Sequence, residues 1–248
     1  MIKFFRHIRR SLLNDNKMGK YFKYAIGEII LVMIGILLAL QVNNWNQNRI
    51  ENNEENEVIA KLHKDFIENK KSLNEYISEV NLEINAQMTL LSLIGASKEE
   101  LAVQNLDSLF YNSLEASEFA FADNTIKNIM QSGRLNLLKN EEITDLLYQW
   151  NTLSEVRQMR MSKLDDWTNN HLLPYLISKI SFKEMDAQGN FKWTGKSKVK
   201  PDYYPLFQEV AFENYLDNSL WFHQQVLERC EETDKLIDKI INATKSND

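Results

Sequence analysis

Residues 24–42 read YAIGEIILVMIGILLALQV, and Glu28 is the only charged residue among them. No Asp, Glu, Lys or Arg follows until Arg49. A helix of about 20 apolar residues crosses the roughly 30 Å hydrocarbon core of a bilayer. Aromatic residues flank the stretch, with Phe22 on one side and Trp45 on the other, as is typical of membrane interfaces. The stretch therefore predicts one transmembrane helix over residues 24–42.

The charges on the two sides of this stretch are unequal. Residues 1–23 carry seven Lys or Arg and one Asp, a net charge of +6, whereas residues 29–248 carry 22 basic and 33 acidic residues, a net charge of −11. Basic flanks stay in the cytoplasm, so the N-terminus is predicted to be cytoplasmic and the remaining chain extracytoplasmic. The acidic part would repel the phosphates of a nucleic acid, which excludes nucleic acid as a predicted partner.

The segment 1–23 is predicted to be basic, amphipathic and cytoplasmic, lying on the membrane surface. Its apolar residues recur on one helical face, at Ile2, Phe5, Ile8 and Leu12. Two other interpretations of residues 24–42 are a cleaved signal peptide and a buried core helix. The signal peptide is disfavoured because the apolar run is longer than usual, and no small-residue cleavage site follows it.

Three residues of the predicted span are candidates for contact with another membrane helix. Gly35 and Ala39 form a small-xxx-small pair, which lets a second helix approach closely. Glu28 shares their helical face, and an ionisable group in lipid is costly enough to indicate a role. Because Glu28 lies one turn from Tyr24, its side chain could instead extend to the cytoplasmic interface. The predicted partners are membrane lipid and either a second copy of the chain or another membrane protein.

Two stretches of the sequence resemble a family of single-span membrane proteins from Bacteroidota. The first covers residues 1–48 and includes YAIGEI at residues 24–29 and QVNNWN at residues 41–46. The second, SGRLNLLKN at residues 132–140, is similar to a helix–turn–helix segment of that family. The family is defined as a domain of unknown function, so it implies a bacterial inner-membrane protein with a periplasmic domain and transfers no catalytic residue.

Residues 58–248 are predicted to form an antiparallel helical bundle, which makes the chain all-α. The whole sequence holds only seven Gly and three Pro, and this scarcity of turn residues favours helices. Apolar residues of the first helix recur three or four positions apart, with a gap at Asn69: Val58, Leu62, Phe66, Leu73, Ile77, Val80, Ile84, Met88 and Leu91. Residues 43–57 are rich in Asn and Glu, and they either continue this helix or form a flexible stalk.

Cap residues predict the later helices of the bundle. The boundary signals are Gly95, a capping box of Ser97 and Glu100 before one helix over 98–114, Asp123, Gly133, Asn140 and Pro174. The last helix has heptad spacing at Leu216, Leu220, His223, Leu227, Cys230, Asp234, Ile237 and Ile241, and pairs with the first helix or with a second copy. Residues 181–205 are predicted to be irregular or a small hairpin, with 191–194 as a candidate strand.

Patterns of catalytic and metal-binding residues do not occur in the sequence. It has no HExxH or Glu-x-x-His motif, no Gly-rich phosphate loop and no Gly-x-Ser-x-Gly elbow. His223 and Cys230 share a helix face, but seven residues separate them by about 10.5 Å along the axis, too far for a thiol–imidazole pair. The protein is therefore predicted to have no cofactor, no metal and no enzymatic activity.

Aromatic residues gather around segment 181–205 and along the start of the last helix. Trp193, Tyr203, Tyr204 and Trp221 are the candidate ligand or partner patch, although the same residues could close one end of the core. The leading functional hypothesis is a non-enzymatic envelope protein that acts by association with itself or a larger membrane assembly. The alternative is a periplasmic ligand-sensing bundle, which would need a signalling partner because 23 cytoplasmic residues cannot hold an output domain.

Overall fold

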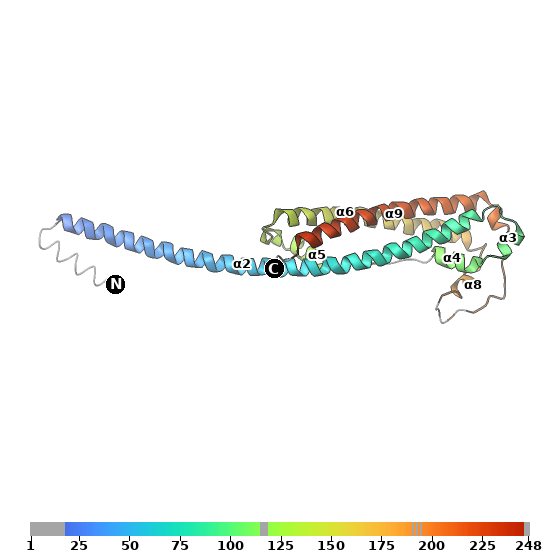
Figure 1. Cartoon of the computed structure of the whole chain (residues 1–248), viewed down its shortest axis with the longest axis horizontal. Coiled ribbons are helices and arrows are strands. Elements are labelled where there is room, and N and C mark those ends of the chain that lie inside the picture. Colours follow the sequence, from blue (N-terminus) through green and yellow to red (C-terminus); the bar gives the residue numbers. More distant parts are fainter. Residues whose placement is uncertain (1–17, 115–118, 190, 192, 194, 246–248) are drawn as a thin grey trace. The chain divides into compact units, whose positions relative to one another are not determined.

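The computed structural model of the chain describes residues 18–114, 119–189, 191, 193 and 195–245 (Figure 1). The chain divides into two compact units, residues 1–57 and 58–248. All regular elements among the described residues are helices, so the predicted all-α class is confirmed. The predicted amphipathic segment over residues 2–12 lies outside the described residues, as do 192 and 194 of the candidate hairpin. Phe191 and Trp193 are in no strand.

Helix α2, Met18–Ser92, is the longest element and has residues in both units. Residues 43–57, for which the sequence left open a helix or a stalk, are helical. In the second unit the interior positions of α2 follow an unbroken 4-3 repeat: Leu62, Phe66, Asn69, Leu73, Tyr76, Val80, Glu83, Gln87 and Leu90. Leu62, Phe66, Leu73 and Val80 are buried as predicted, and Val58 is partly buried. At the remaining predicted positions the buried residue lies one place earlier than Ile77, Ile84, Met88 and Leu91.

Polar partners explain why hydrophobicity alone gave the wrong positions on α2. Asn69 fills the apparent gap because its side-chain amide exchanges two hydrogen bonds with the backbone of Ala122, at 2.7 and 3.2 Å. Further along, Gln87 donates to the Ser113 carbonyl at 2.9 Å. A buried polar group costs little when it is hydrogen-bonded, so these residues occupy the interior.

Helix α6, Glu141–Trp167, and helix α9, Val210–Ala243, complete a three-helix bundle with the second-unit part of α2 (Figure 1). The side chain of Asn140 caps α6 by accepting from the Glu142 N–H at 2.9 Å, as predicted. Helix α9 packs antiparallel to α2. The pairs that define this order are His63 with Thr244 (3.1 Å), Lys70 with Asp238 (2.9 Å) and Glu83 with His223 (3.1 Å). Of the two partners predicted for α9, the structure contains the pairing with the first helix.

The interior face of α9 also differs in part from its predicted heptad. Four of the predicted positions are buried: Leu216, His223, Cys230 and Ile237. The intervening ones are shifted one residue earlier, to Ser219, Val226, Thr233 and Ile240. Thr233 is tolerated there because its hydroxyl bonds the preceding helical turn, donating to the Arg229 carbonyl at 2.6 Å. Asp234, predicted on this face, is half-buried at its edge and pairs with Lys70 at 2.8 Å.

Short helices connect the three long ones. They are α3 (Lys98–Ala102), α4 (Leu106–Leu114), α5 (Asn124–Gln131), the 3-10 turn η1 (Arg134–Leu137), the π-turn η2 (Thr168–Leu172), α7 (Leu173–Leu176), α8 (Phe182–Asp186) and the 3-10 turn η3 (Leu206–Gln208). The capping box of Ser97 and Glu100 is confirmed. The single helix predicted over 98–114 is two, because Asn105 starts a second one by accepting from the Ser108 N–H at 3.2 Å. Asp123 precedes α5 but makes no capping bond, and it pairs with Lys127 instead.

Two hydrophobic clusters fill the second unit. The first core cluster includes Leu62, Phe66, Tyr76, Val80, Leu147, Trp150, Val226 and Ile237. The second core cluster includes Leu90, Leu101, Phe110, Leu172, Leu176, Phe207, Phe212 and Leu216. Within the first, the rings of Phe66 and Trp150 meet edge to face with centroids 4.8 Å apart. The aromatic residues of the second close one end of the bundle.

Replacing Gly95 with alanine is expected to lower the free energy of unfolding by about 1 kcal/mol. Gly95 has a φ of +77° just after α2, and its N–H donates to the Phe207 carbonyl at 2.8 Å. A side chain in this left-handed conformation is strained by roughly 1–2 kcal/mol. Thermal unfolding monitored by circular dichroism measures the loss. Gly195→Ala, in an irregular segment without positive φ, is the matched control, and equal melting temperatures for the two variants would contradict the prediction.

Candidate functional site

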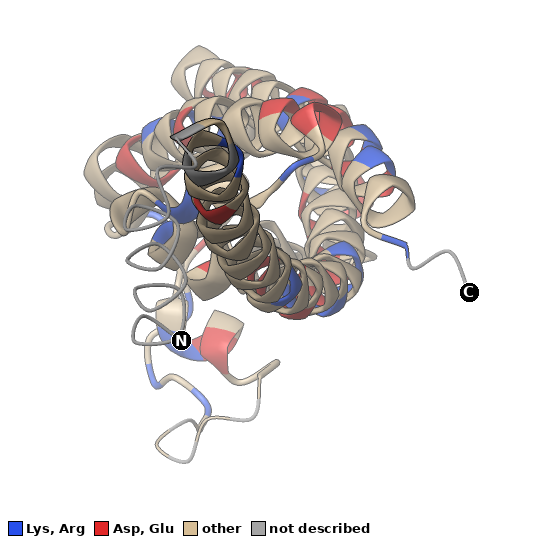
Figure 2. Ribbon diagram, turned by 90° about the vertical axis from the view of Figure 1, so that its left-hand side faces the viewer, with Lys and Arg blue, Asp and Glu red and all other residues tan. Residues whose placement is uncertain are grey.

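The first candidate site is the apolar part of α2 in the first unit. From Phe22 to Ile50, all side chains are exposed except those of Ala25 and Glu28, which are half-buried. From Ile29 to Ile50 this exposure extends around the whole helix. No charged residue occurs between Ile29 and Asn48, and Figure 2 shows a stretch of tan ribbon on this part of α2. Amphipathic helices of soluble bundles have one apolar face, whereas a helix that is apolar on all sides belongs in lipid or inside a protein. By length and composition it is a candidate membrane span, the only one among the described residues.

Gly35 and Ala39 lie at the surface of this apolar section. A Cβ added at Gly35 would meet no other atom within 4 Å, so the helix is open to close approach at this point. Glu28 is half-buried on the same helical face, seven residues before Gly35. The structure thus places the three predicted helix-contact residues on an accessible face, and their role in a contact stays a prediction.

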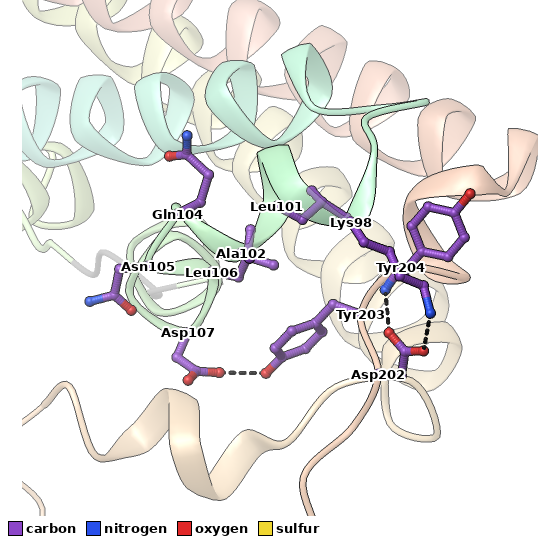
Figure 3. A pocket seen from close by; sticks show the side chains of 10 residues that line it. All are labelled: Lys98, Leu101, Ala102, Gln104, Asn105, Leu106, Asp107, Asp202, Tyr203 and Tyr204. Atoms are coloured by element: carbon purple, nitrogen blue, oxygen red, sulfur yellow. Dashed lines mark hydrogen bonds and ion pairs between the residues drawn. The ribbon is translucent and has the colours of Figure 1, made fainter.

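The second candidate site is a pocket of about 330 Å³ in the second unit (Figure 3). Residues from α3, α4 and the segment before η3 line it, among them Lys98, Asp107, Asp202, Tyr203 and Tyr204. Two of the four predicted patch residues, Tyr203 and Tyr204, are therefore in one pocket. The sequence pattern missed Lys98 and Asp107 as pocket residues. They lie about 100 residues before the two tyrosines, on helices whose order in space was unknown.

The polar groups of this pocket pair largely with one another. The Tyr203 hydroxyl donates to the carboxylate of Asp107, and burial together with this bond raises the pKa of the phenol. Lys98 forms an ion pair with Asp202 at 3.6 Å, and its ammonium lies 5.1 Å from the centre of the Tyr204 ring. The pocket can therefore present an aromatic face and paired charges to a polar ligand.

The two predicted tryptophans do not line the pocket. Trp193 is 73% exposed and contacts Phe191, with ring centroids 4.8 Å apart. Trp221 is half exposed on α9, where its ring meets that of Phe222 edge to face. The structure does not bring Trp193 and Trp221 together with Tyr203 and Tyr204, so the four residues are not one patch.

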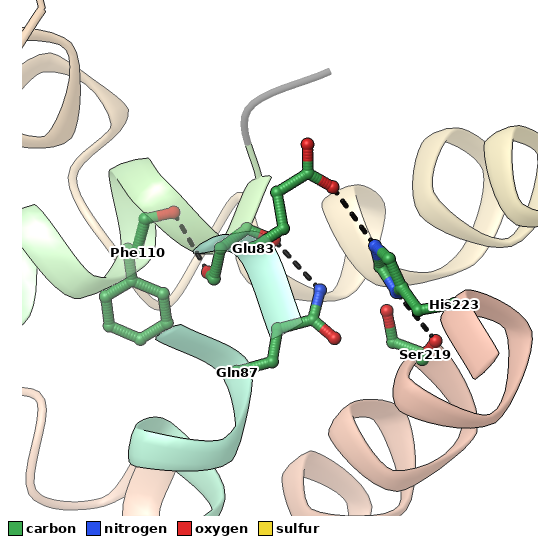
Figure 4. A network of polar contacts seen from close by, with 6 residues as sticks. Glu83, Gln87, Phe110, Ser219 and His223 are labelled. Atoms are coloured by element: carbon green, nitrogen blue, oxygen red, sulfur yellow. Dashed lines mark hydrogen bonds and ion pairs between the residues drawn. The ribbon is translucent and has the colours of Figure 1, made fainter. Parts of the chain in front are cut away.

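His223 and Cys230 both lie buried on the interior face of α9. His223 bonds Glu83 and the Ser219 carbonyl (Figure 4). Cys230 is fully buried, and burial raises the pKa of its thiol to about 11. Among the described residues, no three His, Cys, Asp or Glu side chains are placed to hold a metal ion.

Cys230 is expected to resist thiol reagents at pH 8 while the protein is folded. A thiolate is the reactive form, and both the raised pKa and the lack of access suppress it. In the unfolded chain the thiol pKa returns to about 8.5. The thiol therefore contributes stability below pH 8.5, and this contribution is lost as the pH rises from about 8.5 towards 11. Labelling by an aromatic disulfide reagent with and without urea measures the difference; rapid labelling without urea would contradict the expectation.

The chain was compared with family models, curated proteins and solved structures, and nothing matches in any of the three.

Proposed function

We propose that the protein is a non-enzymatic, single-pass membrane protein that holds a helical bundle beside the bilayer and acts by association. The observation that carries this proposal is the section of α2 from Ile29 to Val42, which has no charged residue and is exposed around its whole circumference. Burying such a helix in lipid removes its apolar surface from water and leaves every backbone group bonded within the helix. Membrane lipid is therefore the first proposed partner.

The proposed orientation has a cytoplasmic N-terminus and a periplasmic bundle at a bacterial inner membrane. Its support is the distribution of charge, with a net +6 before the span and −11 after it. The likeness of residues 1–48 to single-span proteins of Bacteroidota points in the same direction. Alkaline phosphatase fused after Asp248 tests the orientation, because the enzyme is active only in the periplasm. An inactive alkaline phosphatase fusion, together with an active fusion of a reporter that works only in the cytosol, would refute this orientation.

The proposed association uses the helical face of Glu28, Gly35 and Ala39. A photoreactive amino acid at Ala39 should crosslink the protein to a second copy or to another membrane protein in native membranes. The matched control is Leu37, which lies about 160° around the helix from Ala39, so its crosslinking should be weaker. The absence of any crosslinked product from both positions, or equal crosslinking from Ala39 and Leu37, would contradict the proposed contact face.

A second candidate function is ligand sensing, and the pocket of Figure 3 favours it because Tyr203 and Tyr204 line it together. A ligand that binds the folded protein raises its melting temperature by mass action. A small-molecule screen by thermal shift, performed on the wild type and on Tyr204→Ala, would support this candidate if a shift is lost in the variant. Shifts that are identical in both proteins would exclude this pocket as the binding site.

A further inference from the structure

A second cavity, separate from the pocket of Figure 3, lies beside α6 in the second unit. Its volume is about 530 Å³, within the range of sites for small organic ligands. Helix α6 contributes Ser154, Arg157, Met161 and Asp165 to its lining, which also includes Phe119 and Phe121. The cavity thus combines aromatic and thioether surface with several polar groups.

Arg157 is the unusual member of this cavity. Its side chain is more than nine-tenths buried, and its Nε and Nη1 atoms are inaccessible to solvent and have no hydrogen-bond acceptor among the described residues. The guanidinium lies against aromatic rings, with its central carbon 4.2 Å from the centre of Phe121 and 5.6 Å from that of Phe119. Burial lowers the pKa of Arg157 to about 10, so the group still carries its charge at neutral pH. A buried charge without an acceptor is costly, and an anion would offset that cost.

The hydroxyl of Ser154 is a second potential hydrogen-bond donor in the same cavity. Its Oγ is buried without a hydrogen-bond partner among the described residues. It lies three residues before Arg157, so the two side chains share one face of α6. A carboxylate offers two acceptor oxygens, which suits a guanidinium N–H on one side and a hydroxyl on the other.

The charges around the cavity limit what kind of anion it can hold. Lys127 also lines it, but the ammonium is already paired with Asp123 at 2.9 Å. Asp165 also lines the cavity, and its carboxylate would repel a second negative charge on the ligand. A monoanion is therefore favoured over a phosphate dianion, and the rings of Phe119 and Phe121 suit a ligand with an apolar group.

We propose that this cavity binds a small monocarboxylate bearing an apolar group, with its carboxylate on Arg157 and Ser154. This inference goes beyond the proposed membrane association and does not depend on it. The site would give the bundle a chemical specificity that the sequence does not reveal, because a single arginine inside a helix is usually interpreted as a surface residue.

The experiment is titration calorimetry of the full chain in mild detergent with benzoate as the probe. Benzamide has the same shape without the charge, and inorganic phosphate tests for a general anion site. Arg157→Gln should weaken benzoate binding at least tenfold, since hydrogen bonds to charged groups are the strong ones. Arg160→Gln is the matched control, because Arg160 is also partly buried on α6 but does not line the cavity.

The expected result is benzoate binding that Arg157→Gln weakens at least tenfold and Arg160→Gln retains, with no binding of benzamide. Equal binding of benzoate and benzamide, equal or tighter binding of phosphate, or no binding of benzoate would overturn the proposal. If circular dichroism shows that Arg157→Gln does not fold, Ser154→Ala tests the proposal instead, because it removes one hydrogen-bond donor and leaves the charge of Arg157. It should weaken benzoate binding several-fold, and unchanged affinity in that case would also overturn the proposal.

Discussion

Replacing both Ile34 and Leu37 with arginine is expected to release the protein from the membrane. Both residues are near the middle of the apolar section of α2, and both side chains are more than half exposed. An arginine at the centre of a transmembrane helix costs roughly 2.5–3.5 kcal/mol on insertion scales, so the pair costs about 5–7 kcal/mol. This cost is large enough to change the partitioning by several orders of magnitude.

Alkaline carbonate extraction followed by sedimentation measures this effect. The wild type should remain in the membrane pellet, whereas the double variant should appear in the supernatant or be degraded. Ile67→Arg is the matched control, because Ile67 is an exposed apolar residue of α2 outside the candidate span. A double variant that stays in the pellet as firmly as the wild type would show that residues 24–42 are not in lipid. A wild type that is soluble without detergent would lead to the same conclusion.

Local signals in the sequence predicted most helix boundaries correctly. These signals are Gly95, the capping box at Ser97 and the Asn140 cap. Each depends on residues at most three positions apart, so the local sequence is enough to predict it. The interior faces of α2 and α9 were predicted less well. On α2, polar residues that distant segments satisfy occupy interior positions, such as Asn69 bonded by Ala122 and Glu83 bonded by His223. A partner so far along the chain leaves no periodic signal.

The candidate sites show the same division between local and distant information. The apolar section around Gly35 is visible in composition alone, because among the described residues no distant segment of the chain packs against it. Tyr203 and Tyr204 could be selected as neighbours in sequence, whereas Lys98 and Asp107 join them only through tertiary folding. Arg157 could not be selected at all, since Phe119 and Phe121, whose rings lie against its guanidinium, come from the segment before α6.

Disrupting the pair of Glu83 and His223 is expected to destabilise the fold. The pair belongs to a buried polar layer with Gln87, Ser113 and Ser219 (Figure 4). On α2 this layer lies between Val80 of the first core cluster and Leu90 of the second, so it separates the two clusters. The His223 Nδ1 bonds the Ser219 carbonyl at 2.9 Å, and a carbonyl can only accept, so Nδ1 carries a hydrogen. The 3.1 Å contact of Nε2 with Glu83 then requires one more proton, on the ring or on the carboxyl group.

Glu83→Ala is therefore expected to lower the free energy of unfolding by about 1–3 kcal/mol, because it leaves a nitrogen of the buried imidazole without its partner. Glu83→Gln should cost far less, since the amide can donate to Nε2 of a neutral ring. The double variant Glu83→Leu with His223→Leu should be more stable than the sum of its single variants predicts, because it leaves neither polar group unpaired.

Thermal and urea unfolding of the full chain in detergent, followed by circular dichroism, measures these differences. Glu79→Ala is the matched control on the same helix, and its exposed side chain should contribute less than about 0.5 kcal/mol. Equal losses in Glu79→Ala and Glu83→Ala, or strictly additive losses in the double variant, would contradict the argument. In that case the polar layer between the two core clusters would not contribute to the pairing of α2 with α9.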